Sequence, residues 1–385
     1  MRSAATLLVL AGVLSCLEPP RNPAAPDQMD PTCVPRTSMD GSDVARCLWL
    51  GHVIDERTFV SADSLVRAAA TLAREQQGDS GSLPYFRGLE LVRAVQHLAD
   101  FYNSGQFADS ARFNRMIDHV AVTVEYVRGT IHAANTLYYP ARTPQLVWFY
   151  YSGTGFYFQP VTTVQQLVYL IGAPGIGTDT LLKTGEALWR YAVWHDGEGQ
   201  HFPRWEYQFP WYASGAVWLS PPWESAMAQG TVMELFTELY RRTSDPVWKR
   251  RAYEAFRSFQ VSMDAGGARM PDTTHGYWWE EYHPRVMVFN GSVKALIMLG
   301  DFAQTMSDTL ALRMYKRGLD AVKFYTPRYD LGYWTYYSLT GYLATRGYHA
   351  YHVQLLDALY AQSGDPWVKE VADRWRTYVP PPGVQ

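Results

Sequence analysis

Two segments of this chain repeat one helix-turn-helix design 120 residues apart. "ELFTELYRRTSDPVW" (234–248) and "LLDALYAQSGDPWV" (355–368) each end a helical pattern at Leu-Tyr, turn through Thr or Ser, and continue with Asp and Pro. Asp is a preferred N-cap residue, and Pro suits the first helical position, where its missing N–H is not needed. The two segments therefore predict helix pairs that are built in the same way.

Apolar residues at helical spacing extend this design over most of the chain. "ADSLVRAAATLARE" (62–75) and "FRGLELVRAVQHLADFYNSG" (86–105) are two further examples. Similar helix ends recur near "HLADFYNSG" (97–105), "LVYLIGAPG" (167–175) and "IMLGDFAQTMSD" (297–308), and together with the two repeated segments they indicate a hairpin period of roughly 60 to 70 residues. Five or six such hairpins either stack as a solenoid or close into a ring. We expect a mainly α fold, an incomplete or complete α/α toroid of the (α/α)6 type with small β-hairpin insertions.

Aromatic residues are concentrated in four stretches between the predicted helices. The chain holds 27 Tyr and 14 Trp, and the aromatic content is 15%. Aromatic faces stack on flat rings, while Glu, Tyr hydroxyls and Asn place hydrogen bonds, so this mixture suits a polar ligand such as a carbohydrate. Ring closure would gather the stretches into one cleft. They cover residues 138–160, 201–230, 276–291 and 328–352.

The N-terminus predicts export and lipid anchoring. Arg2 precedes a short apolar run that ends at Ser15 and Cys16, and the run is too short to span a bilayer. We interpret residues 1–16 as a lipoprotein-type signal peptide, 17–49 as a Pro-rich tether, and 50–385 as the catalytic domain. The protein would then be exported to a bacterial periplasm or outer membrane surface, where it contacts the membrane only through a lipid on Cys16.

Composition and missing motifs exclude several classes of chemistry. The net charge is -3 and the pI is about 6.4, which does not indicate nucleic-acid binding. The chain lacks a Walker loop, a dinucleotide fingerprint, HExxH, CxxC pairs and GxSxG, so we expect no cofactor and no metal. Glu224, Glu280, Glu281 and Asp330 keep glycoside hydrolysis open. An exported compartment permits Cys33 and Cys47 to pair, but the sequence leaves their pairing open.

A cluster of tyrosines and histidines near the C-terminus indicates proton-transfer chemistry. Tyr337, Tyr348, His349 and His352 lie within sixteen residues, and Tyr348 and His352 are four apart, on one face of a helix. Removal of a proton beside a carboxylate needs a base, neutralisation of the enolate and an acid. Tyr serves as the base if a neighbouring charge lowers its pKa from about 10.

Four segments together resemble a known family. "PPWESAMAQG" (221–230), "WWEEYHPRVMVFNGSVKALIMLGDF" (278–302), "RYDLGYWTYYSL" (328–339) and "GYHAYHVQLL" (347–356) resemble, in order and spacing, the C-terminal region of D-glucuronyl C5-epimerases. The resemblance covers roughly residues 140 to 378. It implies an α/α toroid-type domain that converts D-glucuronate to L-iduronate in heparosan or heparan-sulfate precursors without a cofactor.

The resemblance also implies which residues act on the substrate. The family's catalytic positions fall on Glu281, Tyr282, Tyr337 and Tyr348. In the implied two-base mechanism one Tyr takes H5, another donates a proton to the opposite face, and Glu281 orients or tunes a base. Which Tyr serves which face stays open.

Substrate binding is expected to differ from that of the animal members. They carry a Tyr where this chain has Glu224, and an Arg where it has Thr340, so other arginines would hold the acidic groups. The expected partner is an acidic polysaccharide, and a homodimer is left open. The expected substrate-binding residues are Tyr157, Gln159, Arg204, Trp223, Glu224, Gln229, Trp279, Arg285, Asn290, Arg328, Arg346, His349 and His352.

The sequence leaves two alternatives to epimerisation. A uronate lyase shares the first step, abstraction of H5, and then expels the C4 oxygen. A non-catalytic glycan-binding lipoprotein would use the same aromatic residues without turnover. Only the epimerase and the lyase exchange or remove H5, so the fate of that hydrogen separates the three.

Overall fold

The computed structural model describes residues 30–384, apart from residues 77, 79–81, 130–136, 142, 152–154, 172–176, 216 and 284. The predicted signal peptide (1–16), with Cys16, and most of the predicted tether lie outside the described residues.

Helices make up most of the described chain, which confirms the mainly α prediction. The α-helices are α1 (Gly41–Leu50), α2 (Glu56–Glu75), α3 (Leu83–Asn103), α4 (Ser110–Arg128), α5 (Pro160–Ile171), α6 (Thr178–Arg190), α7 (Ala226–Thr243), α8 (Pro246–Gln260), α9 (Phe289–Met306), α10 (Thr309–Tyr325), α11 (Arg346–Ser363) and α12 (Pro366–Arg376). Short 3-10 helices cover Pro31–Cys33, Met263–Ala265 and Thr326–Arg328.

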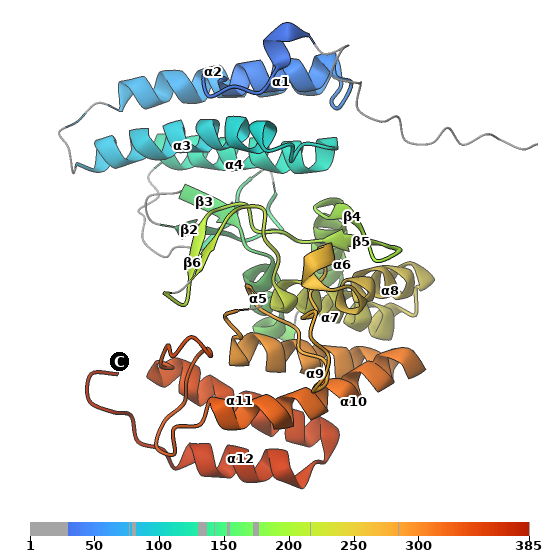
Figure 1. The fold of residues 1–385 in the computed structure, drawn as a ribbon. Helices are drawn as coiled ribbons and strands as arrows, with labels where there is room; N and C mark the ends of the chain where they lie inside the picture. Colours follow the sequence, from blue (N-terminus) through green and yellow to red (C-terminus); the bar gives the residue numbers. More distant parts are fainter. Residues whose placement is uncertain are drawn as a thin grey trace, which may run out of the picture.

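The C-terminal half consists of three helical hairpins of the predicted design. α7, α9 and α11 begin about 60 residues apart, and each packs against the helix that follows it. α9 also packs on α7 and on α11, so these three helices form a continuous inner layer (Figure 1). The hairpin period expected from the sequence is confirmed in this half.

Aspartate caps set the hairpin turns as the sequence predicted. The Asp245 carboxylate accepts the N–H of Val247 at 2.8 Å, and the Asp365 carboxylate accepts the N–H of Trp367 at 3.0 Å. In both helices Pro occupies the first turn. Each cap satisfies a backbone donor that has no partner inside the helix, which fixes the start of α8 and α12.

The closed ring is not confirmed. Figure 1 draws α1 and α2 at one end of the molecule and α11 and α12 at the other. The principal packing contacts join helices that are close in chain order, such as α1 with α2 and α3, or α9 with α11. The described helices therefore form a row, and closure into a toroid stays a prediction.

Three small antiparallel sheets interrupt the helices, as expected for β-hairpin insertions. Their order is β1-β2-β3, β4-β5 and β6-β7. The strands are β1 (Leu137–Tyr138), β2 (Trp148–Tyr151), β3 (Gly155–Phe158), β4 (Val193–Gly197), β5 (Gln200–Arg204), β6 (Trp211–Ala213) and β7 (Val217–Leu219).

The predicted boundary of the tether at residue 49 is wrong. Residues 41–49 belong to α1, which packs on α2 and α3, because Val44, Ala45 and Leu48 bury an apolar face. A disulfide between Cys33 and Cys47 ties the preceding 3-10 helix to α1 and settles the pairing that the sequence left open. The folded part of the chain thus begins before residue 50.

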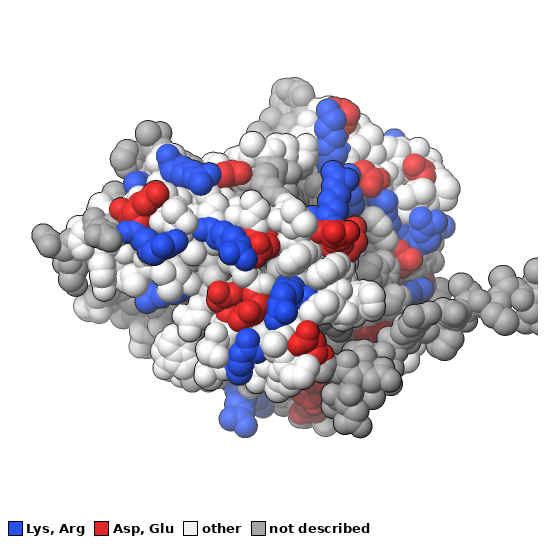
Figure 2. Space-filling view, turned by 90° about the horizontal axis from the view of Figure 1, so that it is seen from above, with Lys and Arg blue, Asp and Glu red and all other residues white. Residues whose placement is uncertain are grey.

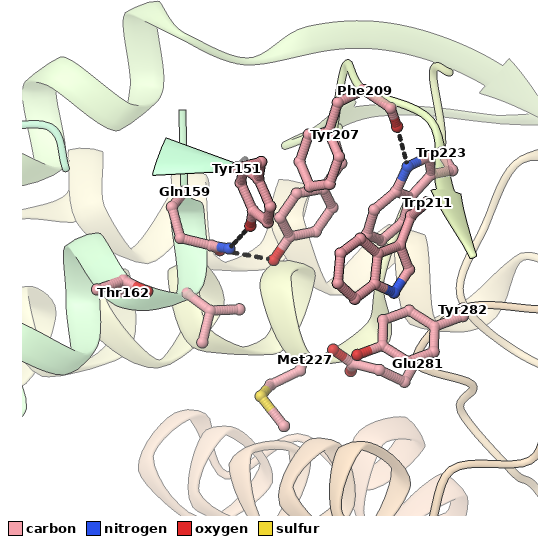
Figure 3. Close-up of a pocket in the computed structure, with 11 residues that line it drawn as sticks. Tyr151, Gln159, Thr162, Tyr207, Phe209, Trp211, Trp223, Met227, Glu281 and Tyr282 are labelled. Atoms are coloured by element: carbon pink, nitrogen blue, oxygen red, sulfur yellow. Dashed lines mark hydrogen bonds between the residues drawn. The ribbon is translucent and has the colours of Figure 1, made fainter. Parts of the chain in front are cut away.

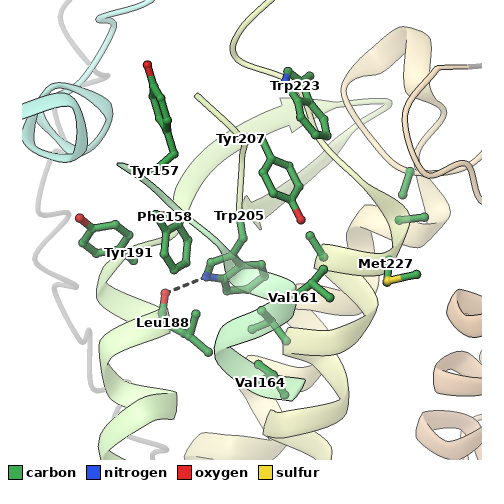
Figure 4. Packing of buried hydrophobic residues seen from close by; sticks show 14 of the residues in the cluster. Tyr157, Phe158, Val161, Val164, Leu188, Tyr191, Trp205, Tyr207, Trp223 and Met227 are labelled. Atoms are coloured by element: carbon green, nitrogen blue, oxygen red, sulfur yellow. Dashed lines mark hydrogen bonds between the residues drawn. The ribbon is translucent and has the colours of Figure 1, made fainter. Parts of the chain in front are cut away.

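Large aromatic side chains fill the core below the site. Trp205 is fully buried and donates its indole N–H to the carbonyl of Leu188 at 2.8 Å, which joins the segment after β5 to the end of α6 (Figure 4). Gln229 on α7 holds the same segment, because its amide bonds both the N–H and the carbonyl of Trp205. This core fixes the segment that carries the next aromatic residues toward the site.

The surface at the α1–α2 end mixes charges of both signs. Figure 2 shows Lys and Arg interspersed with Asp and Glu on this face, and pairs such as Arg67 with Asp63 lie along the helices. Among the described helices, none combines the length and the apolar character that a membrane crossing needs.

Candidate active site

The candidate site lies where α7, α9 and α11 begin. The loops before these helices are joined to one another: Ala226 N–H donates to the Glu280 carbonyl at 3.0 Å, and Phe289 N–H donates to the Tyr337 carbonyl at 3.1 Å. A β-bridge between Val288 and Ser338 adds a further link. Segments far apart in sequence therefore meet at one end of the inner layer, as expected for the aromatic stretches.

A hollow of about 140 Å³ opens between these loops and the strands above them (Figure 3). In the view of Figure 3, Glu281 and Tyr282 lie below Trp223 and Trp211, across from Gln159. The hollow is lined by Tyr151, Gln159, Val161, Thr162, Tyr207, Phe209, Trp211, Trp223, Met227, Glu281 and Tyr282.

A second hollow of about 280 Å³ adjoins the first. Trp223 and Tyr282 line both hollows, so the two adjoin at these side chains, and together they are called the groove below. A groove with two compartments suits a ligand longer than one sugar ring. The second hollow is lined by Trp218, Leu219, Ser220, Pro222, Trp223, Glu224, Met263, Asp264, Tyr282 and His283.

Glu281 is a buried carboxyl group that faces the first hollow without a cation. Burial raises its pKa to about 7, against the lowering effect of hydrogen bonds from Ser225 and Met227. One carboxylate oxygen has no hydrogen-bond partner, and Glu281 forms no ion pair with any described residue. A carboxyl group in this state changes charge near neutral pH, which is the property required of a general base or acid.

Gly291 explains how Glu281 reaches this position. A Cβ atom at Gly291 would lie 2.6 Å from a carboxylate oxygen of Glu281, closer than real Cβ atoms approach. The first turn of α9 therefore packs directly on the carboxyl group, and only glycine leaves room for it. Gly291 thus serves this close approach.

Four tyrosines surround Glu281. The hydroxyls of Tyr282 and Tyr337 are 3.2 Å apart, and the Tyr337 and Tyr348 rings lie 4.6 Å apart. Burial, followed by the negative charge of Glu281, raises the pKa of Tyr207, Tyr282 and Tyr348, and burial with its neighbours raises that of Tyr337. All four hydroxyls therefore remain protonated at neutral pH, as donors.

The neighbouring Glu280 has a structural role. One of its carboxylate oxygens accepts the N–H groups of Glu281, Tyr282 and Val288 at 2.7, 3.4 and 3.0 Å. Burial raises its pKa to about 8, although these three bonds lower it. Through these bonds Glu280 fixes the backbone of the loop and the start of α9, and it lines neither hollow.

Arg204 and Glu224 belong to a buried ion cluster at the edge of the second hollow. Arg204 donates to Glu206 at 2.6 Å and to Glu224 at 3.1 Å, and Arg112 donates to both oxygens of Glu206. Both arginines hold the pKa of Glu206 at about 2 against burial, whereas burial raises the pKa of Glu224 to about 7. The prediction that Arg204 binds substrate is corrected, since its side chain is buried and paired with Glu206 and Glu224.

Tyr157, Gln229 and Trp279, which the sequence assigned to substrate binding, are buried away from the groove. The Tyr157 ring stacks on His119 at 4.0 Å, and its hydroxyl bonds His97 at 2.7 Å. Trp279 donates its indole N–H to the Phe259 carbonyl at 2.9 Å. The polar atoms of all three side chains form hydrogen bonds within the protein, so these assignments are corrected.

His349 and His352 are likewise structural. His349 stacks on Trp334 at 3.9 Å and bonds Thr335 and the Trp375 carbonyl through its two ring nitrogens. His352 is fully buried, and burial lowers its pKa to about 3. α11 begins at Arg346, and within it Tyr348 is 42% exposed while both histidines are buried. Both assignments to the substrate are corrected.

The remaining arginines and Asn290 line neither hollow. Arg346 donates to the Val384 carbonyl at 3.2 Å, and Arg328 covers the Phe324 ring. Asn290 is buried in the first turn of α9. Arg285 is exposed and forms no ion pair with a described residue. Burial, followed by the charge of Arg285, lowers the pKa of His283, which lines the second hollow. Of these four, Arg285 alone lies beside the groove with a free charge.

The structure places Gln159, Trp223, Glu224, Glu281 and Tyr282 in the groove as expected. Tyr337 and Tyr348 adjoin it through the Tyr282 hydroxyl and the ring contact given above.

Sequence reasoning missed several residues that line the first hollow. Tyr207 stacks on Trp223 at 4.2 Å and donates its hydroxyl to Gln159 at 2.8 Å. The aromatic stretch 201–230 was the available signal, but residue spacing alone does not separate its groove-facing members from its buried ones. The missed residues are Tyr151, Val161, Thr162, Tyr207, Phe209, Trp211 and Met227.

Potential metal ligands are not clustered in the described residues: three or more His, Cys, Asp or Glu side chains do not converge anywhere among them.

The fold and the site define a helical-hairpin protein with an aromatic groove that holds an uncompensated carboxyl group and several phenols. Residues 199–377 match the family model described as "D-glucuronyl C5-epimerase C-terminus". This region is similar to the C-terminal part of D-glucuronyl C5-epimerases, which confirms the resemblance noted in the sequence over these residues.

Two individual relatives match part of the chain. A D-glucuronyl C5-epimerase of Caenorhabditis elegans is 32% identical over 181 residues, which are 42% of this chain and 29% of that protein. An uncharacterized protein of Methanocaldococcus jannaschii is 31% identical over 179 residues, 45% of this chain and 56% of that protein. The chain thus matches about half of one relative's length and less than a third of the other's.

Among solved structures, cellobiose 2-epimerase from Spirochaeta thermophila aligns with a TM-score of 0.31 and 16% sequence identity. The alignment covers 40% of this chain and 42% of that chain. A likeness of this size carries no argument about fold or activity.

Proposed function

We propose that this protein epimerises D-glucuronate to L-iduronate at C5 within an acidic polysaccharide. The observation that carries the proposal is the Glu281 carboxyl group, whose pKa is about 7, in a groove beside the hydroxyl pair of Tyr282 and Tyr337. The family match of residues 199–377 supports the reaction class. The two adjoining hollows support a polymeric substrate over a single sugar.

In this proposal Glu281 is the base, and a tyrosine is the acid. The sequence-based mechanism used tyrosines on both faces, but burial and the Glu281 charge raise the tyrosine pKa values, so a phenolate is disfavoured at neutral pH. Glu281 has a pKa near the working pH, where a general base is most effective. The pKa values thus favour one carboxylate and one phenol over two phenols.

The reaction then balances without a cofactor. The Glu281 carboxylate takes H5, and the electron pair of the C–H bond is delocalised into the uronate carboxyl group as an enolate. A phenol O–H donates its proton to the opposite face of C5, and solvent returns a proton to the phenolate and takes one from Glu281. Tyr348 suits the donor role because it is 42% exposed and can exchange with solvent, while Tyr282 and Tyr337 supply hydrogen bonds to the enolate.

The uronate carboxylate needs a cation nearby, and Arg285 supports this role. It is exposed, lies next to His283 at the second hollow, and has no carboxylate partner among the described residues. Arg204, by contrast, already neutralises Glu206 and Glu224. We place the substrate's acidic group on the Arg285 side of the groove.

Heparosan is the first substrate to test, because the resemblance of the sequence is to enzymes that act on it. In deuterium oxide, deuterium enters C5 while L-iduronate appears and chain length is constant, as followed by NMR and size-exclusion chromatography. Chain shortening with an ultraviolet-absorbing unsaturated end assigns the protein to the lyases instead. Binding without loss of H5 on a panel of glucuronate polymers contradicts both enzymatic functions.

Export and lipid anchoring at Cys16 are proposed on separate grounds. The Cys33–Cys47 disulfide supports an oxidising compartment, whereas Cys16 lies outside the described residues. We expect Cys16→Ser to move the protein from the membrane fraction to the soluble fraction of an expressing bacterium. Unchanged membrane partitioning would contradict the anchor.

A further inference from the structure

The β6–β7 hairpin presents two large aromatic side chains to solvent beside the groove. Trp218 is 69% exposed and Tyr212 is 48% exposed. Tyr212 and Trp218 are paired across the two strands, and their rings lie 5.1 Å apart with planes tilted by 33°. The Tyr212 hydroxyl donates to the Gly215 carbonyl at 2.7 Å, which fixes its ring on the hairpin.

The hairpin is continuous with both compartments of the groove. Trp211 on β6 lines the first hollow, and Trp218 and Leu219 on β7 line the second. Figure 3 shows Trp211 at the side of the first hollow near Trp223 and Tyr282. A ligand that runs along the groove past Tyr282 and leaves the second hollow therefore meets the Tyr212–Trp218 pair.

We propose that Tyr212 and Trp218 form a stacking platform for a sugar residue of the substrate chain that lies outside the reacting unit. This inference rests on the proposed function for the identity of the polymer. Exposed apolar surface is retained where a ligand covers it, and aromatic faces stack on the C–H faces of pyranose rings while the sugar hydroxyls remain in water. The platform thereby holds a long chain in register while Glu281 acts on one uronate.

The competing explanation is that the ring pair only stabilises the hairpin. Cross-strand aromatic pairs contribute roughly 0.2 to 1 kcal/mol to a sheet, and a two-stranded hairpin is only marginally stable by itself. That role affects thermal unfolding but does not depend on the length of a ligand. The platform predicts a loss of affinity that grows with chain length, so ligand length separates the two roles.

The test measures the affinity of heparosan tetrasaccharide and dodecasaccharide by isothermal titration calorimetry for the wild type, Trp218→Ala, Trp218→Phe and Tyr212→Ala. Tyr139→Ala is the matched control, since Tyr139 is also 48% exposed and lines neither hollow. For Trp218→Ala we expect the dodecasaccharide to lose about tenfold more affinity than the tetrasaccharide, which corresponds to about 1.4 kcal/mol. Trp218→Phe keeps a ring and the strand pairing, and should retain part of this preference.

Equal losses for both lengths, or the same loss in Tyr139→Ala, would overturn the platform. If Trp218→Ala unfolds, the ratio of affinities in Trp218→Phe and Tyr212→Ala decides, and a wild-type ratio in both contradicts the proposal. Deuterium uptake at C5 is measured in parallel. A length-dependent loss of affinity without any C5 exchange by the wild type supports the platform while contradicting the epimerase, and no binding of any glucuronate polymer contradicts both.

Discussion

Two buried carboxyl groups of this molecule show how neighbours decide between a structural and a chemical role. Glu206 lies between Arg112 and Arg204, which hold its pKa at about 2. Glu281 is similarly buried but has tyrosine hydroxyls in place of arginines, and its pKa is raised to about 7. Burial disfavours the charged form of both carboxyl groups, but only at Glu206 do neighbouring arginines offset this cost.

The comparison also explains why the assignment of Arg204 to substrate binding is corrected. An arginine near a sugar groove is expected to bind an acidic substrate, yet Arg204 is needed to stabilise buried carboxylates. Arg204 and Glu206 therefore form a buried ion pair, whereas the Glu281 carboxyl group has no cation beside it and can exchange a proton near neutral pH.

The largest expected effect is on Glu281 itself. Glu281→Gln keeps the side-chain shape and removes the base, so kcat/KM for deuterium uptake at C5 should fall on the order of 10³ to 10⁴-fold with little change in thermal stability. Glu280→Gln is the matched control, since it makes the same change one residue earlier, outside both hollows. Equal losses in the two variants would contradict the distinction.

Removing the charge of Glu206 should damage the fold. Glu206→Gln leaves Arg112 and Arg204 buried without their shared anion, and we expect a loss of about 3 to 5 kcal/mol in the free energy of unfolding, measured with urea at pH 7. The pKa of Glu206 is lowered from 4.5 to about 2 by folding. Its contribution is therefore complete above about pH 4.5 and declines as the pH falls toward 2. Wild-type stability of the variant would show that the cluster is dispensable.

Removal of a tyrosine hydroxyl from the site should have the next largest effect. Tyr337→Phe and Tyr348→Phe keep the rings that pack at 4.6 Å and remove one donor each, so we expect turnover to fall about 10² to 10³-fold with nearly unchanged substrate affinity. Tyr139→Phe serves as a control at an exposed position away from both hollows. Near-wild-type turnover in both groove variants would remove the tyrosines from the mechanism.

The smallest effect is expected for the stability of Glu280→Gln. The pKa of Glu280 is raised from 4.5 to about 8, so folding favours its protonated form, and that contribution is present at low pH and lost as the pH rises through 8. At pH 9 the variant should be more stable than the wild type by on the order of 1 kcal/mol, since the amide oxygen still accepts backbone N–H groups. A less stable variant at pH 9 would show that the charge of Glu280 is needed.

The sequence predicted the parts of the fold that depend on local chemistry. Asp245 and Asp365 cap α8 and α12 as expected, because an N-cap acts within one turn of its own helix. It did not predict Tyr207 in the groove or Tyr157 in the core. Both lie in aromatic-rich strands or loops, and their side chains are directed by contacts with α3, α4 and the loop before α7, which spacing does not reveal.

The candidate site was predicted in outline for the same reason. Glu281, Tyr282, Tyr337 and Tyr348 come together because loops before consecutive inner helices meet, which follows from the hairpin repeat. The proposed roles differ from those expected from the sequence, since the pKa of a tyrosine depends on burial and on the nearby carboxylate. Those quantities come from the packed structure.

The most direct test of the central claim is the pH dependence of H5 exchange by the wild type. If a cation-free Glu281 with a pKa of about 7 is the base, kcat/KM for deuterium uptake from deuterium oxide should be level above about pH 7 and fall tenfold per unit below it, after correction for the isotope effect on pH. A rate that is unchanged from pH 7 down to pH 5, or one that rises only toward pH 10 as a phenolate forms, would contradict the account.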